Sequence, residues 1–344
     1  MHTTIKDIAN ILNVSPATVS LALNDKPGVS ASLRKKIIET AIDLNYIVKR
    51  TNIVYNVTYI VYMGDQIDND DWLTYRTLFW SAIHTNAKVI GFNVQTEIVK
   101  EDSSLPKTLR TLAAKTDGII FLGTRLDNHS RCLDILEKIN QTICPVVILS
   151  ADMIRNFELD CVTADNLLGS MEAVEYLIHK GHRRIGYLIS TRKTNNCMLR
   201  EYGVDQAIRE SNDASLIKVP VGSSNAEAKS DIQKWLDTKP ELPTAFFADS
   251  DIIAFAAMQV FAKNQIKIPE DVSLIGYGNM REGEYIIPSL TSVYVSPDHL
   301  CKETLILLQR RIQEFRSPKS ERNHLRVVFP THIVERDSVR DLRE

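Results

Sequence analysis

The sequence predicts a small all-α unit at the N-terminus followed by an α/β body of two lobes with parallel sheets. Within the first 46 residues, apolar side chains recur at helical spacing. From residue 57 onward, short apolar runs alternate with amphipathic stretches of helix length, which is typical of parallel strands covered on both faces. The region from residue 57 to residue 344 is too long for one hydrophobic core, so we expect it to divide into two lobes.

The N-terminal unit is predicted to contain three short helices. Thr4 can cap the first helix, with Asp7 at its third position. Ser15 stands directly before Pro16, and this pair starts a second helix. The serine hydroxyl can bind an N–H that the helix leaves without a partner, and proline has no such N–H. Ser30 caps the third helix. The first two helices, joined by a very short turn, form a helix-turn-helix motif.

The start of the second helix suits a nucleic acid. Residues 15–20 are small or hydroxylated, so they allow close approach to the major groove and contacts to phosphate. Residues 1–50 carry seven Lys and Arg against four Asp and Glu, a net charge of +3, whereas the whole chain carries −2. A basic end on an acidic body favours a polyanionic partner. From the pattern alone, a DNA-binding unit and a plain three-helix packing module remain equal alternatives.

The predicted organisation is a helical domain over residues 1–46, a linker over 47–56 and a two-lobed domain over 57–344. The strands expected in the body are Val57–Tyr62, Val89–Val94, Gly118–Leu122, Val146–Leu149, Ile185–Ile189, Ala245–Phe247 and Val272–Ile275. The helices expected between them include Leu105–Lys115, Arg131–Asn140, Leu167–His179, Ala226–Leu236 and Ile252–Lys263.

Several classes of protein are not supported. The five cysteines are scattered, odd in number and without a CxxC spacing, which fits a reducing cytosol with no disulfide framework or zinc cluster. The sequence has no secretory signal and no apolar run of membrane-spanning length, so we expect a cytoplasmic protein. Motifs of nucleotide-binding loops, zinc proteases and serine hydrolases are lacking. We therefore predict no enzyme, cofactor or metal, and we expect His179 and His182 to be surface residues.

A series of segments carries a resemblance to a known family. In the first 46 residues they are Thr4–Ala9, Val14–Ser20, Leu23-Asn24, Val29-Ser30 and Leu44–Tyr46. In the body they are Val162–Asn166, Gly181–Ile185, Pro243–Ala248, Ile268–Tyr277, Pro288–Val293 and Val334–Ser338. In this order the segments closely resemble the LacI family (LacI/GalR) of bacterial transcription regulators, over essentially the whole chain.

The resemblance implies a homodimer whose two N-terminal heads read double-stranded operator DNA. The body would be a two-lobed sensor like a periplasmic binding protein, with a cleft for a small-molecule effector between the lobes. Effector binding there would change lobe closure and thereby the spacing of the heads. On this basis we expect a repressor with no membrane partner.

The resemblance also assigns DNA-contacting positions. Pro16 and Ala17 fall where relatives contact bases, and Ala17 can touch only a thymine methyl group. Leu21 stands where many relatives carry Arg, and it either faces DNA or packs in the core. The positions that resemble the phosphate-facing set are Thr4, Ser15, Thr18, Ser20, Asn24, Ser30 and Tyr46. After Tyr46 the proline-containing hinge of relatives is missing, so the question whether a hinge helix forms stays open. Lys49 and Arg50 can still attract phosphate.

The expected effector cleft departs from its relatives. Ser150, Ser250 and Gly278 stand where Asp, Asn and Asp are common. Arg200 matches the usual effector-contacting arginine, and Arg125 follows an expected strand. Two arginines without those carboxylates favour an anionic effector, such as an anionic sugar derivative. The other expected lining residues are Asn196 and Asp251, together with Trp72 and Tyr75, which can stack on a ring or pack in a dimer.

Two other functions stay open from the sequence. The chain can be a solute-binding or enzymatic α/β protein for sugars or nucleosides, whose head serves assembly only. Alternatively, it binds DNA while its body serves as a scaffold for a partner protein, which the lost polar positions in the cleft suggest.

Overall fold

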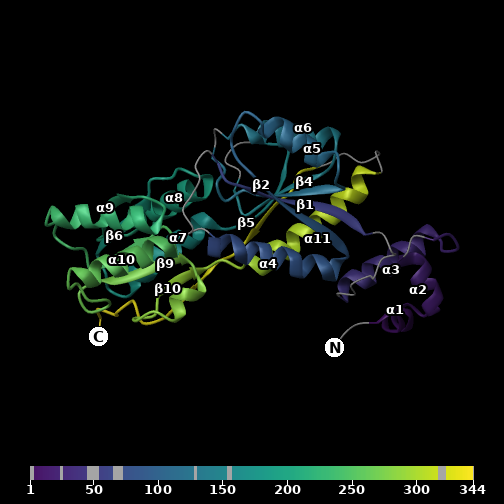
Figure 1. The fold of residues 1–344 in the computed structure, drawn as a ribbon. Coiled ribbons are helices and arrows are strands. Elements are labelled where there is room, and N and C mark those ends of the chain that lie inside the picture. The colour runs from purple at the N-terminus through teal and green to yellow at the C-terminus, as the bar shows by residue number, and fades with distance from the viewer. Residues whose placement is uncertain are drawn as a thin grey trace. The chain divides into compact units, whose positions relative to one another are not determined.

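A computed structural model describes residues 4–23, 26–44, 54–64, 73–127, 130–152, 157–316 and 323–343 of the chain. The chain divides into two units, residues 1–55 and 56–344 (Figure 1). We call the first the head and the second the body, and each is described by itself.

The head contains the three predicted helices, α1 (Ile5–Leu12), α2 (Pro16–Leu23) and α3 (Ala31–Asp43). The predicted caps of α1 and α2 are confirmed. The Thr4 N–H donates to Asp7 Oδ2 at 2.7 Å, and the Asp7 N–H donates to Thr4 Oγ1 at 3.4 Å. The Thr18 N–H donates to Ser15 Oγ at 3.0 Å. The turn after α1 is tight because Asn13 adopts a left-handed conformation, with φ 50°.

One hydrophobic core holds the three helices of the head together. Its buried members are Ile8, Ala9, Val19, Ala22, Leu23, Ile37 and Ala41. Arg34 on α3 donates from Nη1 to the Ala22 carbonyl at 3.0 Å and from Nη2 to the Lys26 carbonyl at 2.6 Å. This guanidinium binds carbonyls at the C-terminal end of α2, where the helix dipole favours a cation. The core and Arg34 together fix α2 within the head.

The first lobe of the body, lobe 1, is built on a six-stranded sheet. Its spatial order is β11 (Arg326–Phe329), β5 (Asp160–Ala164), β4 (Val146–Leu149), β3 (Gly118–Leu122), β1 (Tyr55–Tyr62) and β2 (Phe92–Val99). The pairs from β11 through to β1 are parallel. The helices of this lobe are α4 (Leu73–Ile90), α5 (Leu105–Ala113), α6 (Cys132–Thr142) and α11 (Pro297–Phe315).

The second lobe, lobe 2, has a six-stranded sheet of its own. The order is β12 (His332–Val334), β10 (Thr291–Tyr294), β9 (Ser273–Gly278), β8 (Ala245–Ala248), β6 (Arg184–Ser190) and β7 (Ser215–Val221). The edge pair β10 and β12 is antiparallel, and the other pairs are parallel. Its helices are α7 (Asn166–His179), α8 (Asn195–Glu210), α9 (Asn225–Asp237) and α10 (Asp251–Lys263), with a short 3₁₀ helix at Arg281–Glu284.

Within the described residues the chain passes between the lobes three times: from β5 to α7, from β10 to α11 and from β11 to β12. The first element after the chain returns from lobe 2 to lobe 1 is α11, which packs beside α4 (Figure 1). Three neighbouring connections allow the lobes to move as rigid bodies about a common hinge. The predicted two-lobed body with parallel sheets is thereby confirmed.

Two expectations were wrong, one for the start of a strand and one for the exposure of a histidine. The strand expected at Val89–Val94 begins only at Phe92, because α4 continues to Ile90 and Gly91, with φ 93°, ends it. His182 is 1% exposed rather than on the surface. Its ring nitrogens lie 3.0 Å from Thr244 Oγ1 and 3.1 Å from the Arg340 carbonyl, so it anchors the C-terminal segment. In the described part of the chain, every helix is too short or too polar to cross a membrane.

Candidate DNA-binding helix and interlobe cavity

The start of α2 presents an exposed surface of small side chains. Ser15, Pro16 and Ala17 are exposed, whereas Val19 on the opposite side is buried in the core of the head. The Ser15 hydroxyl caps the helix and also lies 2.8 Å from Thr18 Oγ1. The head therefore offers a helix tip that a groove of duplex DNA can accommodate.

The other predicted DNA-contacting residues that the structure describes differ in exposure. Thr4 and Ser30 are exposed. Thr18, Ser20 and Leu21 are half-buried, so part of each side chain takes part in packing of the head. Four of the predicted residues lie outside the described part of the chain: Asn24, Tyr46, Lys49 and Arg50.

In the body, a cavity of about 70 Å³ lies between the two lobes. A cavity of this size has room for on the order of five water molecules, which is the space of a small polar ligand. Seven of the predicted effector residues line it: Arg125, Ser150, Asn196, Arg200, Ser250, Asp251 and Gly278. Trp72 and the side chain of Tyr75 lie outside the described residues.

The cavity lies where parallel strands end and helices begin. Ser150 follows β4, Ser190 ends β6, and Gly278 ends β9. Binding sites in open parallel sheets form at this edge because loops from neighbouring strands meet there. Thr194 and Ser250 cap α8 and α10, and both line the cavity. The N-terminal ends of two helix dipoles thus lie at the cavity, where they favour negative charge.

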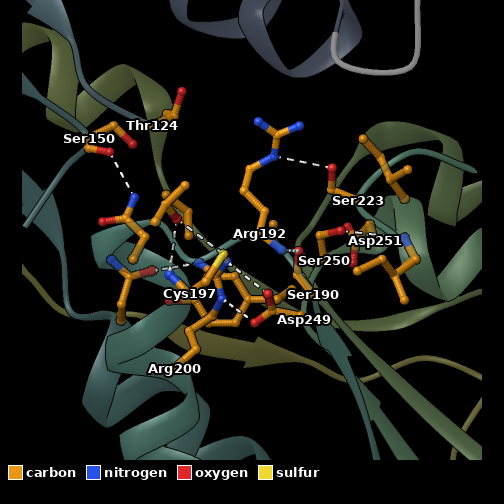
Figure 2. Close-up of a pocket in the computed structure, with 18 of the residues that line it drawn as sticks. Thr124, Ser150, Ser190, Arg192, Cys197, Arg200, Ser223, Asp249, Ser250 and Asp251 are labelled. Carbon is orange, nitrogen blue, oxygen red and sulfur yellow. Dashed lines mark hydrogen bonds and ion pairs between the residues drawn. The ribbon is translucent and has the colours of Figure 1, made fainter. Parts of the chain in front are cut away.

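Arg200 on α8 is part of a buried ion pair (Figure 2). Its Nε donates to Asp249 Oδ1 at 2.8 Å, and Tyr187 donates from its hydroxyl to the same oxygen at 2.9 Å. The side chains of Arg200 and Asp249 are 11% and 1% exposed. The guanidinium also lies 4.8 Å from the centre of the Tyr277 ring. Asp249 therefore neutralises Arg200, a pairing that was not expected from the sequence.

Arg192 is a third arginine of the cavity, and sequence reasoning missed it. Figure 2 shows its side chain extending from the end of β6, with Nε directed at Ser223. Nε donates to Ser223 Oγ at 3.2 Å, and the backbone N–H donates to Ser190 Oγ at 3.2 Å. Arg192 also lines a larger opening of about 490 Å³, which shares Arg125, Thr194 and Ser223 with the cavity.

The cavity is lined by charged residues of both signs. They are three arginines, Arg125, Arg192 and Arg200, and two aspartates, Asp249 and Asp251. Ser190, Arg192, Ser223 and Asp249 were not predicted as binding residues. The position of Ser190 and Arg192 directly after an expected strand was an available signal, whereas β7, which leads to Ser223, was not expected.

Asp251 is a buried carboxylate at the start of α10. It accepts hydrogen bonds from the Met280 N–H at 2.6 Å and from Ser292 Oγ at 2.6 Å. Burial raises the pKa of Asp251 to about 6, although these hydrogen bonds oppose the rise. A Cβ on Gly276 would lie 2.1 Å from Asp251 Oδ1, so only glycine leaves room for this carboxylate.

The contribution of Asp251 to the stability of the body is expected to fall as the pH rises from about 4 to 6. The folded state keeps a proton on Asp251 up to a pKa of about 6, against 3.8 for an ordinary carboxyl. The folded state therefore binds more protons in this window, and deprotonation costs about 3 kcal/mol of unfolding free energy. Urea unfolding of the wild type and Asp251→Asn at several pH values measures the effect. Between pH 4 and 6, the difference in unfolding free energy between the two proteins should change by about 3 kcal/mol. Parallel curves of unfolding free energy against pH would contradict the raised pKa of Asp251.

In the described residues, groups of three or more His, Cys, Asp or Glu that could hold a metal ion are absent.

Comparison with known proteins finds a matching family model in both the head and the body. A model of bacterial regulatory proteins of the lacI family matches residues 4–48, and a model of the periplasmic binding protein-like domain matches residues 174–339. The HTH-type transcriptional regulator DegA of Bacillus subtilis is 30% identical over 358 residues, which cover 99% of each chain. The HTH-type transcriptional repressor CytR of Escherichia coli is 29% identical over 322 residues, or 90% of each chain. The lac repressor dimer bound to operator and an anti-inducer has the same fold, with a TM-score of 0.69 at 20% identity, over 99% of this chain and 100% of that one.

Proposed function

The chain belongs to the lacI family of bacterial regulatory proteins and is a DNA-binding transcriptional regulator; from that premise we propose how its two units work. A homodimer binds operator DNA in the cytoplasm through the exposed tips of two α2 helices. A small anionic effector binds in the interlobe cavity and controls operator binding. The cavity itself is the observation that supports a metabolite over a partner protein as the signal.

Footprinting tests the operator function. The DNA upstream of the regulator's own gene and of neighbouring genes is incubated with the full chain and probed for protection. We expect one protected site with approximate two-fold symmetry, because two identical heads read two half-sites. If no site is protected in any of these regions, with or without candidate effectors, the proposed operator function is wrong.

The charge of the cavity supports the effector class. Its lining residues include three arginines and two aspartates. The helix N-termini at Thr194 and Ser250 add positive potential. A carboxylate or phosphate group balances this potential, whereas a neutral sugar leaves it in place.

A thermal-shift screen separates the two kinds of ligand. Sugar phosphates and sugar acids are expected to raise the Tm by several degrees at concentrations about 100 times their Kd, because that excess adds about 3 kcal/mol. Neutral hexoses should leave the Tm unchanged. Arg192→Gln should lose the shift, whereas Arg209→Ala, on the exposed C-terminal part of α8, should keep it. An equal shift with a neutral hexose, retained by Arg192→Gln, would refute the anionic class.

A further inference from the structure

The first two residues of α8 join lobe 2 to lobe 1. Asn195 and Asn196 belong to the helix of lobe 2 that also carries Arg200. They bond to two segments of lobe 1 that follow strands, one at Leu126 after β3 and one at residues 150–152 after β4. Four hydrogen bonds therefore cross from one lobe to the other directly beside the cavity.

Asn196 makes a two-point contact with the backbone of lobe 1. Its Nδ2 donates to the Ser150 carbonyl at 2.9 Å, and the Asp152 N–H donates to its Oδ1 at 3.1 Å. A side-chain amide offers a donor and an acceptor side by side, whereas a carboxylate offers only acceptors. Asparagine is therefore suited to this contact, and aspartate is not.

The lobe 1 side of the contact has an unusual backbone. Ser150 adopts φ 57°, in the left-handed region that non-glycine residues rarely occupy. The Ser150 N–H is meanwhile held by the Val162 carbonyl at 2.8 Å. Such a conformation persists only where its surroundings stabilise it, and the bonds to Asn196 and Val162 supply that stabilisation.

Asn195 adds two bonds in a dry environment. Its backbone N–H donates to the Leu126 carbonyl at 2.9 Å, and its Nδ2 donates to the Asp152 carbonyl at 2.9 Å. Asn195 is 2% exposed, and the Asp152 carboxylate beside it accepts from Arg326 Nη2 at 2.6 Å. Hydrogen bonds that are shielded from water are stronger than exposed ones.

We propose that Asn195 and Asn196 form an interlobe latch, which holds the two lobes closed over the cavity before an effector arrives. Ser150 and Asn196 both line the cavity, so their hydrogen bond closes one of its walls. An effector enters when the latch opens, and lobe closure is then set jointly by the latch and the ligand. Only this regulatory consequence rests on the proposed function; the latch itself is a property of the body.

Amide hydrogen exchange tests the latch in the full chain, with no DNA or ligand added. The reporters are the N–H groups of Asp152 and Asn195, which donate across the lobes. In Asn196→Ala, their exchange relative to strand-centre amides of Phe121 and Phe247 should rise roughly ten- to hundred-fold, since two hydrogen bonds are lost. Asn196→Asp should give at least the same rise, because its carboxylate faces the Ser150 carbonyl.

Two further variants serve as matched controls. Ser150→Gly retains the carbonyl that Asn196 binds and suits the left-handed backbone, so the exchange ratio should stay within about two-fold of the wild type. Arg209→Ala changes an exposed residue of the same helix and should behave likewise. If Asn196→Ala leaves the ratio of reporter exchange to strand-centre exchange unchanged, the latch is refuted. This includes the case in which both sets of amides accelerate equally. Since neither DNA nor effector is present, this result is independent of whether the operator proposal holds.

Discussion

An Ala17→Glu variant is expected to bind operator DNA at least about 100-fold more weakly than the wild type. Ala17 is exposed at the tip of α2, where the proposed groove contact leaves room for a methyl group only. A glutamate there places a negative charge among phosphates. Docking in the groove would also strip water from this carboxylate without giving it a hydrogen-bond partner, which costs about 3 kcal/mol or more. Gel shifts with the footprinted operator, at one fixed salt concentration, measure the loss.

The charge and the size of the new side chain can be separated. Ala17→Gln has nearly the same shape without the charge, so it should lose less affinity than Ala17→Glu. Both variants should unfold within about 0.5 kcal/mol of the wild type, because the substituted position is exposed. Operator binding by Ala17→Glu at wild-type strength, in a protein that melts normally, would show that the α2 tip does not enter the groove.

Local chemistry explains which elements could be predicted. The caps at Thr4 and Ser15 involve residues three positions apart, so the sequence itself contains both partners. The strands β3 and β4 were predicted with their exact bounds, since each is a continuous run of buried apolar residues. At Val89–Val94 the apolar run spans the end of α4 and the start of β2, and hydrophobicity alone does not separate a buried helix end from a strand.

Edge strands explain most of what was missed. β7 lies at one edge of its sheet and alternates between exposed and buried residues. β11 and β12 are edge strands of three or four partly exposed residues. Strands of this kind lack the continuous apolar run that marks a buried parallel strand. With β7 not expected, the loop that carries Ser223 into the cavity was not expected either.

Residues lining the cavity were predicted where the family resemblance supplies their positions, but the pairing between distant residues was missed. Ser150, Ser250 and Gly278 follow or end strands, so the topology of a parallel sheet places them at the cavity. Arg200 and Asp249 are 49 positions apart, and only the packing of α8 against the end of β8 brings them together. Asn196 and Ser150 are likewise 46 positions apart and belong to different lobes. The type of a residue and its position after a strand do not show whether its side chain is already paired with an opposite charge.

Removal of the Asp249 carboxylate is expected to destabilise the body strongly. Asp249→Ala leaves Arg200 buried without its carboxylate and removes the acceptor of the Tyr187 hydroxyl. Loss of one partner of a buried ion pair costs about 3–5 kcal/mol. Urea unfolding at pH 7 should show this decrease in the free energy of unfolding. A decrease below about 1 kcal/mol would mean that water reaches Arg200 and that the pair is not buried in solution.

The double variant Arg200→Met with Asp249→Leu separates stability from binding. Replacing both charges with apolar side chains of similar volume removes the uncompensated charge, so most of the lost stability should return. Arg200 also donates from Nη1 to Asn166 Oδ1 at 2.8 Å, at the point where β5 passes into α7. The pair therefore ties the cavity to one of the three connections between the lobes. The compound to use is an anionic one that shifts the wild type. If the double variant is stable and still binds this compound, but its operator affinity no longer changes with it, the pair serves the coupling of cavity and hinge. A response like that of the wild type would confine the role of the pair to filling the cavity wall.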